Sequence, residues 1–294
     1  ALGHPRPVTV ISLLALVVLI PLNMIFMHGL GPIPALGSAG CGFATSILQW
    51  LMLITLAGYI YKASAYRNTS IFSRFDKINL TWVKRILQLG LPIGLAVFFE
   101  VSIFSTGALV LSPLGEVFIA AHQVAISVTS VLFMIPLSLA IALTIRVGTY
   151  YGEKNWASMY QVQKIGLSTA IFFALLTMSF IALGREQIVS VYTQDIEVVP
   201  VAMYLLWFAM GYQLMDALQV SAAGCLRGMQ DTQAPMWITL MAYWVIAFPI
   251  GLYLARYTHW GVAGVWLGLI IGLSIACVLL LSRLYLNTKR LSKT

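Results

Sequence analysis

Charged side chains are scarce in this sequence of 294 residues. They make up 9% of the chain, whereas 60% of the residues are hydrophobic and the mean hydropathy is +0.92. A soluble domain carries about 25% charged residues, so this chain has too little polar surface to cover a water-soluble globule. Because the apolar residues form long blocks, the composition predicts membrane helices rather than one large soluble core.

Cysteine is also scarce. Cys41, Cys225 and Cys277 are scattered, with no Cys-x-x-Cys pair and no histidine at ligand spacing. This pattern argues against a disulfide framework and against a metal site built on cysteine. We interpret all three as small apolar residues, and we expect no cofactor.

Eight apolar blocks are each long enough to cross a bilayer, which takes about 20 helical residues. They cover residues 8–28, 39–61, 86–111, 118–147, 165–183, 198–223, 236–255 and 262–282. Unbroken runs of this length favour helices over the short alternating strands of a membrane barrel. The sequence begins with Ala1, and the first block follows without a signal-peptide cleavage pattern, so we interpret the start as a truncation.

The 17 basic residues are distributed unevenly between the two ends of these blocks. If successive blocks cross in opposite directions, only Arg185 and Arg256 lie on one side. The other side holds Arg6, Lys62, Arg67, Arg74, Lys77, Lys84, Arg85, Arg146, Lys154, Lys164, Arg227, Arg283, Lys289, Arg290 and Lys293. The positive-inside rule therefore predicts a multi-pass protein of the bacterial inner membrane with both ends in the cytoplasm. The basic excess serves topology and anionic lipid, and no nucleic-acid partner is expected.

The first two blocks resemble the last two. Gly37–Gly40 matches Gly261–Gly264, and each motif follows a proline-containing block, with Pro21 in the first case and Pro249 in the second. If the match is a true repeat, equivalent helices are six spans apart and both halves point the same way, as in parallel-repeat transporters. The alternative is coincidence, because small residues at this spacing are common in membrane helices.

The repeat predicts where the chain divides. Residues 1–61 would be the last two helices of an N-lobe, residues 62–83 a cytoplasmic linker, and residues 84–294 a complete six-helix C-lobe with a short tail. The expected fold class is an all-α membrane protein whose eight transmembrane helices belong to a twelve-helix, two-lobe transporter. Four N-terminal helices of the same transporter would be its missing partner, and we expect the complete protein to be a monomer.

Only two carboxylates fall inside the predicted spans, Glu100 and Asp216, and Tyr212 lies one turn before Asp216 on the same helix face. A charge at mid-bilayer costs about 2.5–3.5 kcal/mol, so such residues usually mark an ion or substrate path. Carboxylate and phenol oxygens suit Na+, and a buried carboxyl group can alternatively carry H+. Because no basic residue is expected at comparable depth, a mobile cation is the natural partner.

Other polar and aromatic residues are candidates for the wall of a substrate cavity. The candidates are Ser102, Gln123, Phe133 and Gln213. Aromatic faces attract organic cations, but most serine hydroxyls in membrane helices bond to their own helix. His122 lies near a predicted outer boundary, and the sequence leaves open whether it is interfacial.

Prolines at Pro92, Pro136 and Pro249 predict helix kinks. Each kink is either a static packing feature or a place where the helix bends during transport. The sequence does not separate these alternatives.

Three stretches carry a composite motif. The first contains Leu89–Gly94 and Glu100, the second Leu114–Gly115, Ala120–Gln123, Met134–Leu137 and Arg146–Gly148, and the third Asp216–Ala217, Gly224–Gly228, Asp231–Thr232, Pro235, Tyr243–Trp244, Pro249, Gly251, Trp260–Gly261, Trp266 and Gly268. Together these motifs resemble the second half of the multidrug and toxic compound extrusion (MATE) transporters, and the NorM-like branch in particular.

The resemblance implies a two-lobe exporter that exchanges Na+ or H+ for bulky, often cationic, organic compounds and drugs. It places the family's cation-site residues on Glu100, Tyr212 and Asp216, whose residue types all match. The acidic site of the family's N-lobe lies on helices that this sequence does not contain, so it is not carried over.

Three other functions are alternatives. A lipid-precursor flippase of related architecture should have a strongly cationic cavity, whereas these spans hold acids and almost no Arg or Lys. An intramembrane enzyme needs a nucleophile with a base, or a set of metal ligands, within the bilayer, and no such set stands out. An inactive fragment that requires the missing helices is the last alternative.

Overall fold

The computed structural model describes residues 6–29, 34–63 and 79–291. Over these residues the chain forms helices and no strand, and eight helical stretches are long and apolar enough to cross a membrane, as predicted. The chain divides into two units, Ala1–Ile78 and Asn79–Thr294. The division falls within the predicted linker 62–83, most of which lies outside the described residues.

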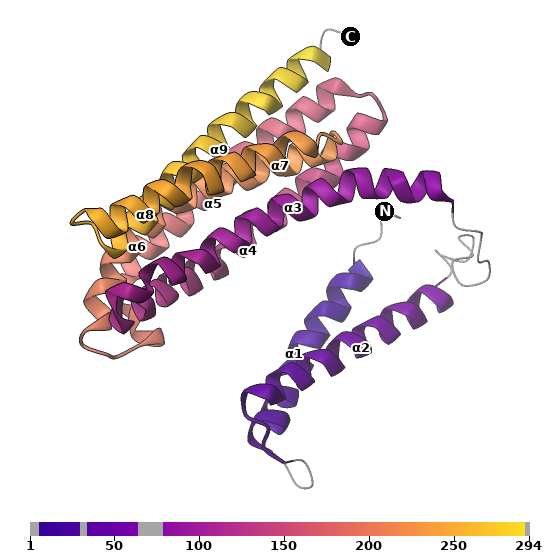
Figure 1. Cartoon of the computed structure of the whole chain (residues 1–294). Coiled ribbons are helices and arrows are strands. Elements are labelled where there is room, and N and C mark those ends of the chain that lie inside the picture. The colour runs from indigo at the N-terminus through magenta and orange to yellow at the C-terminus, as the bar shows by residue number, and fades with distance from the viewer. Residues whose placement is uncertain (1–5, 30–33, 64–78, 292–294) are drawn as a thin grey trace. The chain divides into compact units, whose positions relative to one another are not determined.

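The first unit is a pair of packed helices, α1 (Arg6–His28) and α2 (Ser38–Lys62) (Figure 1). The backbone N–H groups of Leu36 and Gly37 donate to the carbonyls of Phe26 and Met27, at 3.1 and 3.2 Å. Leu36 and Gly37 therefore lie against the end of α1 just before α2 begins.

The second unit contains the remaining six spans (Figure 1). In chain order its elements are α3 (Leu80–Leu111), the 3₁₀ turn η2 (Ser112–Leu114), α4 (Glu116–Gly152), α5 (Trp156–Tyr192), α6 (Val198–Gly228), α7 (Gln233–Leu240), the π-helical segment η3 (Met241–Ala247), α8 (Phe248–Tyr257) and α9 (Val262–Leu291). Helix α6 packs most extensively against α4, and also against α5 and α9. Every residue from Gln219 to Leu226 is buried, so this stretch of α6 is enclosed by its neighbours.

Several helices are longer than the apolar blocks that predicted them. The block 165–183 lies inside α5, which has 37 residues and is about 55 Å long at 1.5 Å per residue. The hydrocarbon core of a bilayer is about 30 Å thick. Hydropathy identifies only the part of α5 that suits lipid, whereas capping fixes where the helix begins. At that N-terminus the Asn155 side chain accepts a hydrogen bond from the Ser158 N–H at 3.1 Å.

Glycines allow α4 and α6 to cross in close contact. A Cβ on Gly224 would lie 2.5 Å from the carbonyl oxygen of Ala140, and one on Gly228 would lie 2.8 Å from that of Thr144. The Thr144 hydroxyl donates to the Gly224 carbonyl at 2.9 Å. Backbone contact and an interhelical hydrogen bond of this kind hold membrane helices together where lipid supplies no hydrophobic drive.

The two glycine motifs of the predicted repeat have the same geometry. Gly37 and Gly261 both have positive φ, at 56° and 49°, and each carbonyl accepts a hydrogen bond from the glycine three residues later, at 3.1 Å for Gly40 and 3.0 Å for Gly264. A Cβ on Gly40 or on Gly264 would collide with the backbone of the preceding helix, α1 or α8 respectively. Matching conformation and matching close contact support a structural repeat over coincidental packing.

The prolines have different local effects. Pro92 and Pro136 lie inside the uninterrupted helices α3 and α4. Pro249 follows the π-helical segment η3, in which the wider turn moves side chains off the α-helical register. The Trp244 indole in η3 donates its Nε1–H to the Phe99 carbonyl of α3 at 3.2 Å. The π-helical segment is thereby joined to the helix that carries Glu100.

Replacing Trp244 with phenylalanine should remove the hydrogen bond between η3 and α3. We expect the free energy of unfolding to fall by about 1 kcal/mol, because a net hydrogen bond of this kind contributes about that much. Trp237→Phe is the matched control, since Trp237 lies on the adjoining α7 and is 55% exposed. Denaturation of the full-length protein in detergent would test this, and equal midpoints for both variants would contradict it.

Candidate functional site

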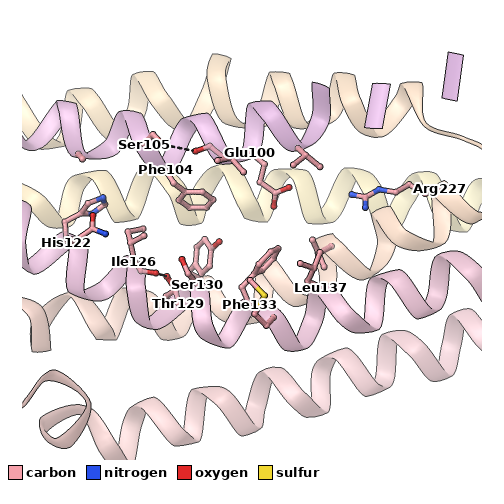
Figure 2. Close-up of a pocket in the computed structure, with 17 residues that line it drawn as sticks. Glu100, Phe104, Ser105, His122, Ile126, Thr129, Ser130, Phe133, Leu137 and Arg227 are labelled. Carbon is pink, nitrogen blue, oxygen red and sulfur yellow. Dashed lines mark hydrogen bonds between the residues drawn. The ribbon is translucent and has the colours of Figure 1, made fainter. Parts of the chain in front are cut away.

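A cavity of about 560 Å³ lies between α3, α4 and α6 (Figure 2). Most of its wall is apolar or aromatic, and its polar groups come from all three helices. It is lined by Val97, Glu100, Val101, Phe104, Ser105 and Ala108 of α3; by His122, Gln123, Ile126, Thr129, Ser130, Phe133, Met134 and Leu137 of α4; and by Tyr212, Val220 and Arg227 of α6. An apolar cavity of this size with a few converging polar groups is typical of small-molecule sites.

The two intramembrane acids belong to one electrostatic cluster. Glu100 is partly buried at the cavity wall, whereas Asp216 is fully buried in α6 and does not line the cavity; the two carboxylates interact electrostatically. Tyr212, one turn before Asp216, lines the cavity and interacts with both acids. In the described part of the chain, neither carboxylate oxygen of Asp216 has a hydrogen-bond partner with good geometry. Among these described residues, Tyr212 is the one side chain that interacts with Asp216 as a hydrogen-bonding group, and a cation or a proton would further stabilise a carboxylate buried in this way.

A buried hydrogen bond lies next to this cluster. The Tyr243 hydroxyl donates to Oε1 of Gln219 at 2.6 Å, and both side chains are buried. Tyr243 comes from η3 and interacts electrostatically with Glu100 and Asp216. The π-helical segment thus contributes to the surroundings of the acids as well as to the α3 contact.

Arg227 corrects one expectation. The sequence suggested that neither acid has a basic residue at comparable depth, but the Arg227 side chain lines the same cavity as Glu100 and interacts with it electrostatically (Figure 2). Arg227 lies near the end of α6, and its long side chain extends along the cavity. Glu100 therefore has a fixed positive neighbour, which Figure 2 shows beyond the carboxylate on one side.

His122 lines the cavity and is only 1% exposed, so its side chain is buried among the helices. Its ring meets that of Trp266 edge-on, with 5.9 Å between the centroids. Its Nδ1 atom has no hydrogen-bond partner among the described residues. Figure 2 shows His122 on the opposite side of Glu100 from Arg227.

The other predicted lining residues separate into two groups. Gln123 and Phe133 line the cavity. Ser102 does not, and its hydroxyl donates to the Phe99 carbonyl of its own helix at 3.2 Å. Gln213 does not line the cavity either; it is buried within the helix packing, and its amide atoms have no partner in the described part of the chain.

One missed residue carried a readable signal. Arg227 follows Asp216 by 11 residues, which is about three helical turns, so both lie on one face of α6. Tyr243 carried no comparable signal, because a π-helical segment changes the register of the residues that follow it.

The donor set suits a cation held by few oxygens. Among the described residues, no group of three or more His, Cys, Asp or Glu could hold a metal ion. A monovalent cation here would use the carboxylates of Glu100 and Asp216 and the phenol oxygen of Tyr212. These are hard oxygen ligands, which alkali cations accept, and the set does not suit zinc or copper.

Comparisons with known proteins agree with this architecture. The model of the MatE family matches residues 92–253, which include α4, α5 and α6 and every residue that lines the cavity. The chain is 74% identical over 293 residues to the probable multidrug resistance protein NorM of Acinetobacter baylyi, covering 100% of this chain and 65% of that protein. It is 42% identical over 286 residues to the multidrug resistance protein NorM of Vibrio cholerae, covering 95% and 62%.

A solved structure shows the same fold. The crystal structure of a eukaryotic MATE transporter superposes with a TM-score of 0.87 at 21% identity, covering 98% of this chain and 63% of that one. The chain thus spans slightly less than two thirds of these proteins' lengths. Because the family model covers more than half of the sequence, including the helices that form the cavity, the chain belongs to the MatE family.

Proposed function

We propose that the chain is the cation-binding part of a secondary multidrug exporter, which expels organic, often cationic, compounds in exchange for Na+ or H+. The multidrug resistance proteins among its relatives support the substrate class. The observation that carries the coupling proposal is the electrostatic pair formed by Glu100, in the wall of a cavity of about 560 Å³, and the buried Asp216. Members of this family are transporters, so no chemical step is assigned to these residues.

The coupling rests on competition between conformational states. A cation at Glu100 and Asp216 lowers the negative charge of the pair, so the pair attracts a cationic drug in the same cavity less strongly. Antiport needs only that cation and drug favour different states of the protein. When the cation leaves, Arg227 remains as the positive neighbour of Glu100 and limits the cost of a buried charge.

The cavity wall suits bulky aromatic cations. Phe104 and Phe133 expose ring surface, and Met134 adds a polarisable, adaptable side chain. Cations are attracted to aromatic faces, so affinity does not depend on one fixed set of hydrogen bonds. The wall carries one carboxylate and one guanidinium, which gives no strong attraction for the phosphates of a lipid precursor.

The basic residues support a position in the bacterial inner membrane with both ends in the cytoplasm. Arg185 and Arg256 are the two basic residues on the opposite side of the membrane, and they lie near the C-terminal ends of α5 and α8. In this orientation the start of α5 and the end of α9 lie at the cytoplasmic surface.

Ion gradients across proteoliposomes that contain the full-length protein would test the proposal. We expect an imposed Na+ or H+ gradient to drive accumulation of ethidium, and dissipation of that gradient to stop it. Accumulation driven by the Na+ gradient alone, by the H+ gradient alone or by either gradient would identify the coupling ion. Ethidium movement that is indifferent to both gradients would contradict cation-coupled export.

A further inference from the structure

The cavity beside Glu100 has two different ends. Figure 2 shows Arg227 on one side of Glu100 and His122 on the other, with the Phe104 ring between Glu100 and His122. The guanidinium of Arg227 repels a positively charged molecule, whereas Phe104 offers it an aromatic face. A cationic molecule held by Glu100 is therefore directed away from Arg227. We call the part of the cavity lined by Phe104, Ala108 and His122 the His122 end.

The imidazole ring of His122 is held in place by two other helices. On α9, the Trp266 ring meets it with 5.9 Å between the centroids. On α3, a Cβ on Gly107 would lie 3.4 Å from Nε2 and 3.5 Å from Cε1 of His122, so the imidazole packs against the glycine backbone. Gly107 follows Glu100 by seven residues, which is about 10 Å along a helix. A fused aromatic ring system of drug size spans that distance.

Ring contacts connect the His122 end to the acid cluster. The Tyr212 ring meets Phe104 with 5.9 Å and Trp266 with 6.2 Å between the centroids, and Trp266 in turn meets His122. The interplanar angles of these three contacts lie between 70° and 76°, so each is an edge-to-face contact, the arrangement that aromatic pairs prefer. The wall is therefore preorganised, and little side-chain freedom is lost when a ligand binds there.

The nitrogen atoms of His122 have no polar partner in the part of the chain that the structure describes. Nδ1 is buried without a hydrogen bond, and neither a hydrogen bond nor an ion pair involves Nε2. A neutral imidazole carries one N–H donor and one acceptor nitrogen. A buried histidine with a packing role alone is usually hydrogen-bonded, because unmet polar groups are costly to bury. A polar group on a molecule in the cavity would supply the partner.

We propose, on the basis of the export function proposed above, that the His122 end is a subsite for the N–H groups of planar aromatic cations. The cationic ring system lies over Phe104 with its charge toward Glu100. An arylamine N–H at the far end of the ring system donates to the unprotonated nitrogen of His122. A bulky cation without N–H groups uses the same aromatic wall and gains nothing from His122.

Isothermal titration of the purified full-length protein in detergent, without any ion gradient, tests this subsite. The probes are ethidium, an ethidium analogue that lacks both amino groups, and tetraphenylphosphonium, which has no N–H group. We expect the wild type to bind ethidium about tenfold more tightly than the analogue, since one net hydrogen bond contributes about that much. His122→Leu should weaken ethidium alone and so remove the difference, which isolates the contact as in a double-mutant cycle. His122→Gln, which offers an amide oxygen in a side chain of similar volume, should restore most of the ethidium affinity.

His259→Leu is the matched control. His259 also contacts a tryptophan ring, that of Trp260, with 5.4 Å between the centroids, but it is exposed and does not line the cavity. Its replacement should leave all three affinities unchanged. The subsite is overturned if His122→Leu binds ethidium as tightly as the wild type does. Equal weakening of all three probes would show a packing role for His122 and would overturn it too.

Transport of tetraphenylphosphonium separates this proposal from the export function. His122→Leu proteoliposomes should accumulate tetraphenylphosphonium at the wild-type rate under an imposed Na+ or H+ gradient, whereas their KM for ethidium should rise about tenfold at an unchanged maximal rate. Wild-type movement of tetraphenylphosphonium that ignores both gradients would refute cation-coupled export. The affinities measured without a gradient would still decide whether His122 receives an N–H group.

Discussion

Glu100→Gln should abolish drug export by the full-length protein while leaving its amount in the membrane unchanged. Glutamine has nearly the same shape as glutamate but cannot carry the charge that attracts a cation or the proton that would travel with it. Coupling energies between two ligands are typically 1–3 kcal/mol, so we expect the rate of gradient-driven export to fall on the order of 100-fold. The measurement is ethidium efflux from cells with and without a sodium gradient.

Glu116→Gln is the control for this substitution. Glu116 begins α4, is exposed, and does not line the cavity, so its replacement should leave export intact. Loss in the Glu100 variant together with sodium dependence of the wild type would support a sodium antiporter, and loss without sodium dependence would support protons. Normal export by the Glu100 variant would refute the site assignment and leave Glu100 with a structural role.

Gly224→Ala should destabilise the second unit although it adds a single methyl group. That carbon would lie 2.5 Å from the Ala140 carbonyl oxygen, so α4 and α6 must separate, and the hydrogen bond from Thr144 to the Gly224 carbonyl weakens. Overpacking of this kind costs about 1–3 kcal/mol. The expected result is a lower unfolding midpoint in detergent and a lower yield of folded protein.

The same helix supplies the comparison. A Cβ on Gly211 would lie 3.7 Å from the nearest atom, Cδ1 of Ile270, which is an ordinary contact. Gly211→Ala should therefore be neutral or stabilising by up to about 1 kcal/mol, because alanine is the better helix former. If both alanine variants unfold at the wild-type midpoint, the tight crossing of α4 and α6 does not limit stability.

Much of the fold could be predicted because bilayer physics leaves few choices. Long apolar blocks must be helices, and the structure has all eight of them. Glu100 and Asp216 could be identified as unusual because an acid within a span is costly, and Tyr212 followed from helical spacing. These three residues could be identified from local sequence alone, because neither the cost of a buried acid nor helical spacing depends on which helices touch.

The rest depended on contacts between helices. Arg227 was placed at the cytoplasmic end by its backbone position, but its side chain reaches the wall that Glu100 shares. Ser102 donates to the Phe99 carbonyl of its own helix and does not line the cavity. The π-helical turn before Pro249 brings Tyr243 to Gln219 and Trp244 to α3. Hydropathy patterns do not reveal such a change of helical register.

The enclosure of α6 bears on how the protein is made. This helix is the least hydrophobic of the eight spans and carries Asp216, Gln213 and Gln219, so it is the span that a translocon would release into lipid least readily. Two of its three principal neighbours, α4 and α5, are synthesised before it, whereas α9 comes last. When α6 leaves the ribosome, a partly assembled protein surface is already present to receive its polar face, and α9 completes the enclosure only after it has been synthesised in turn. The order of helices along the chain is thus also a workable order of membrane insertion.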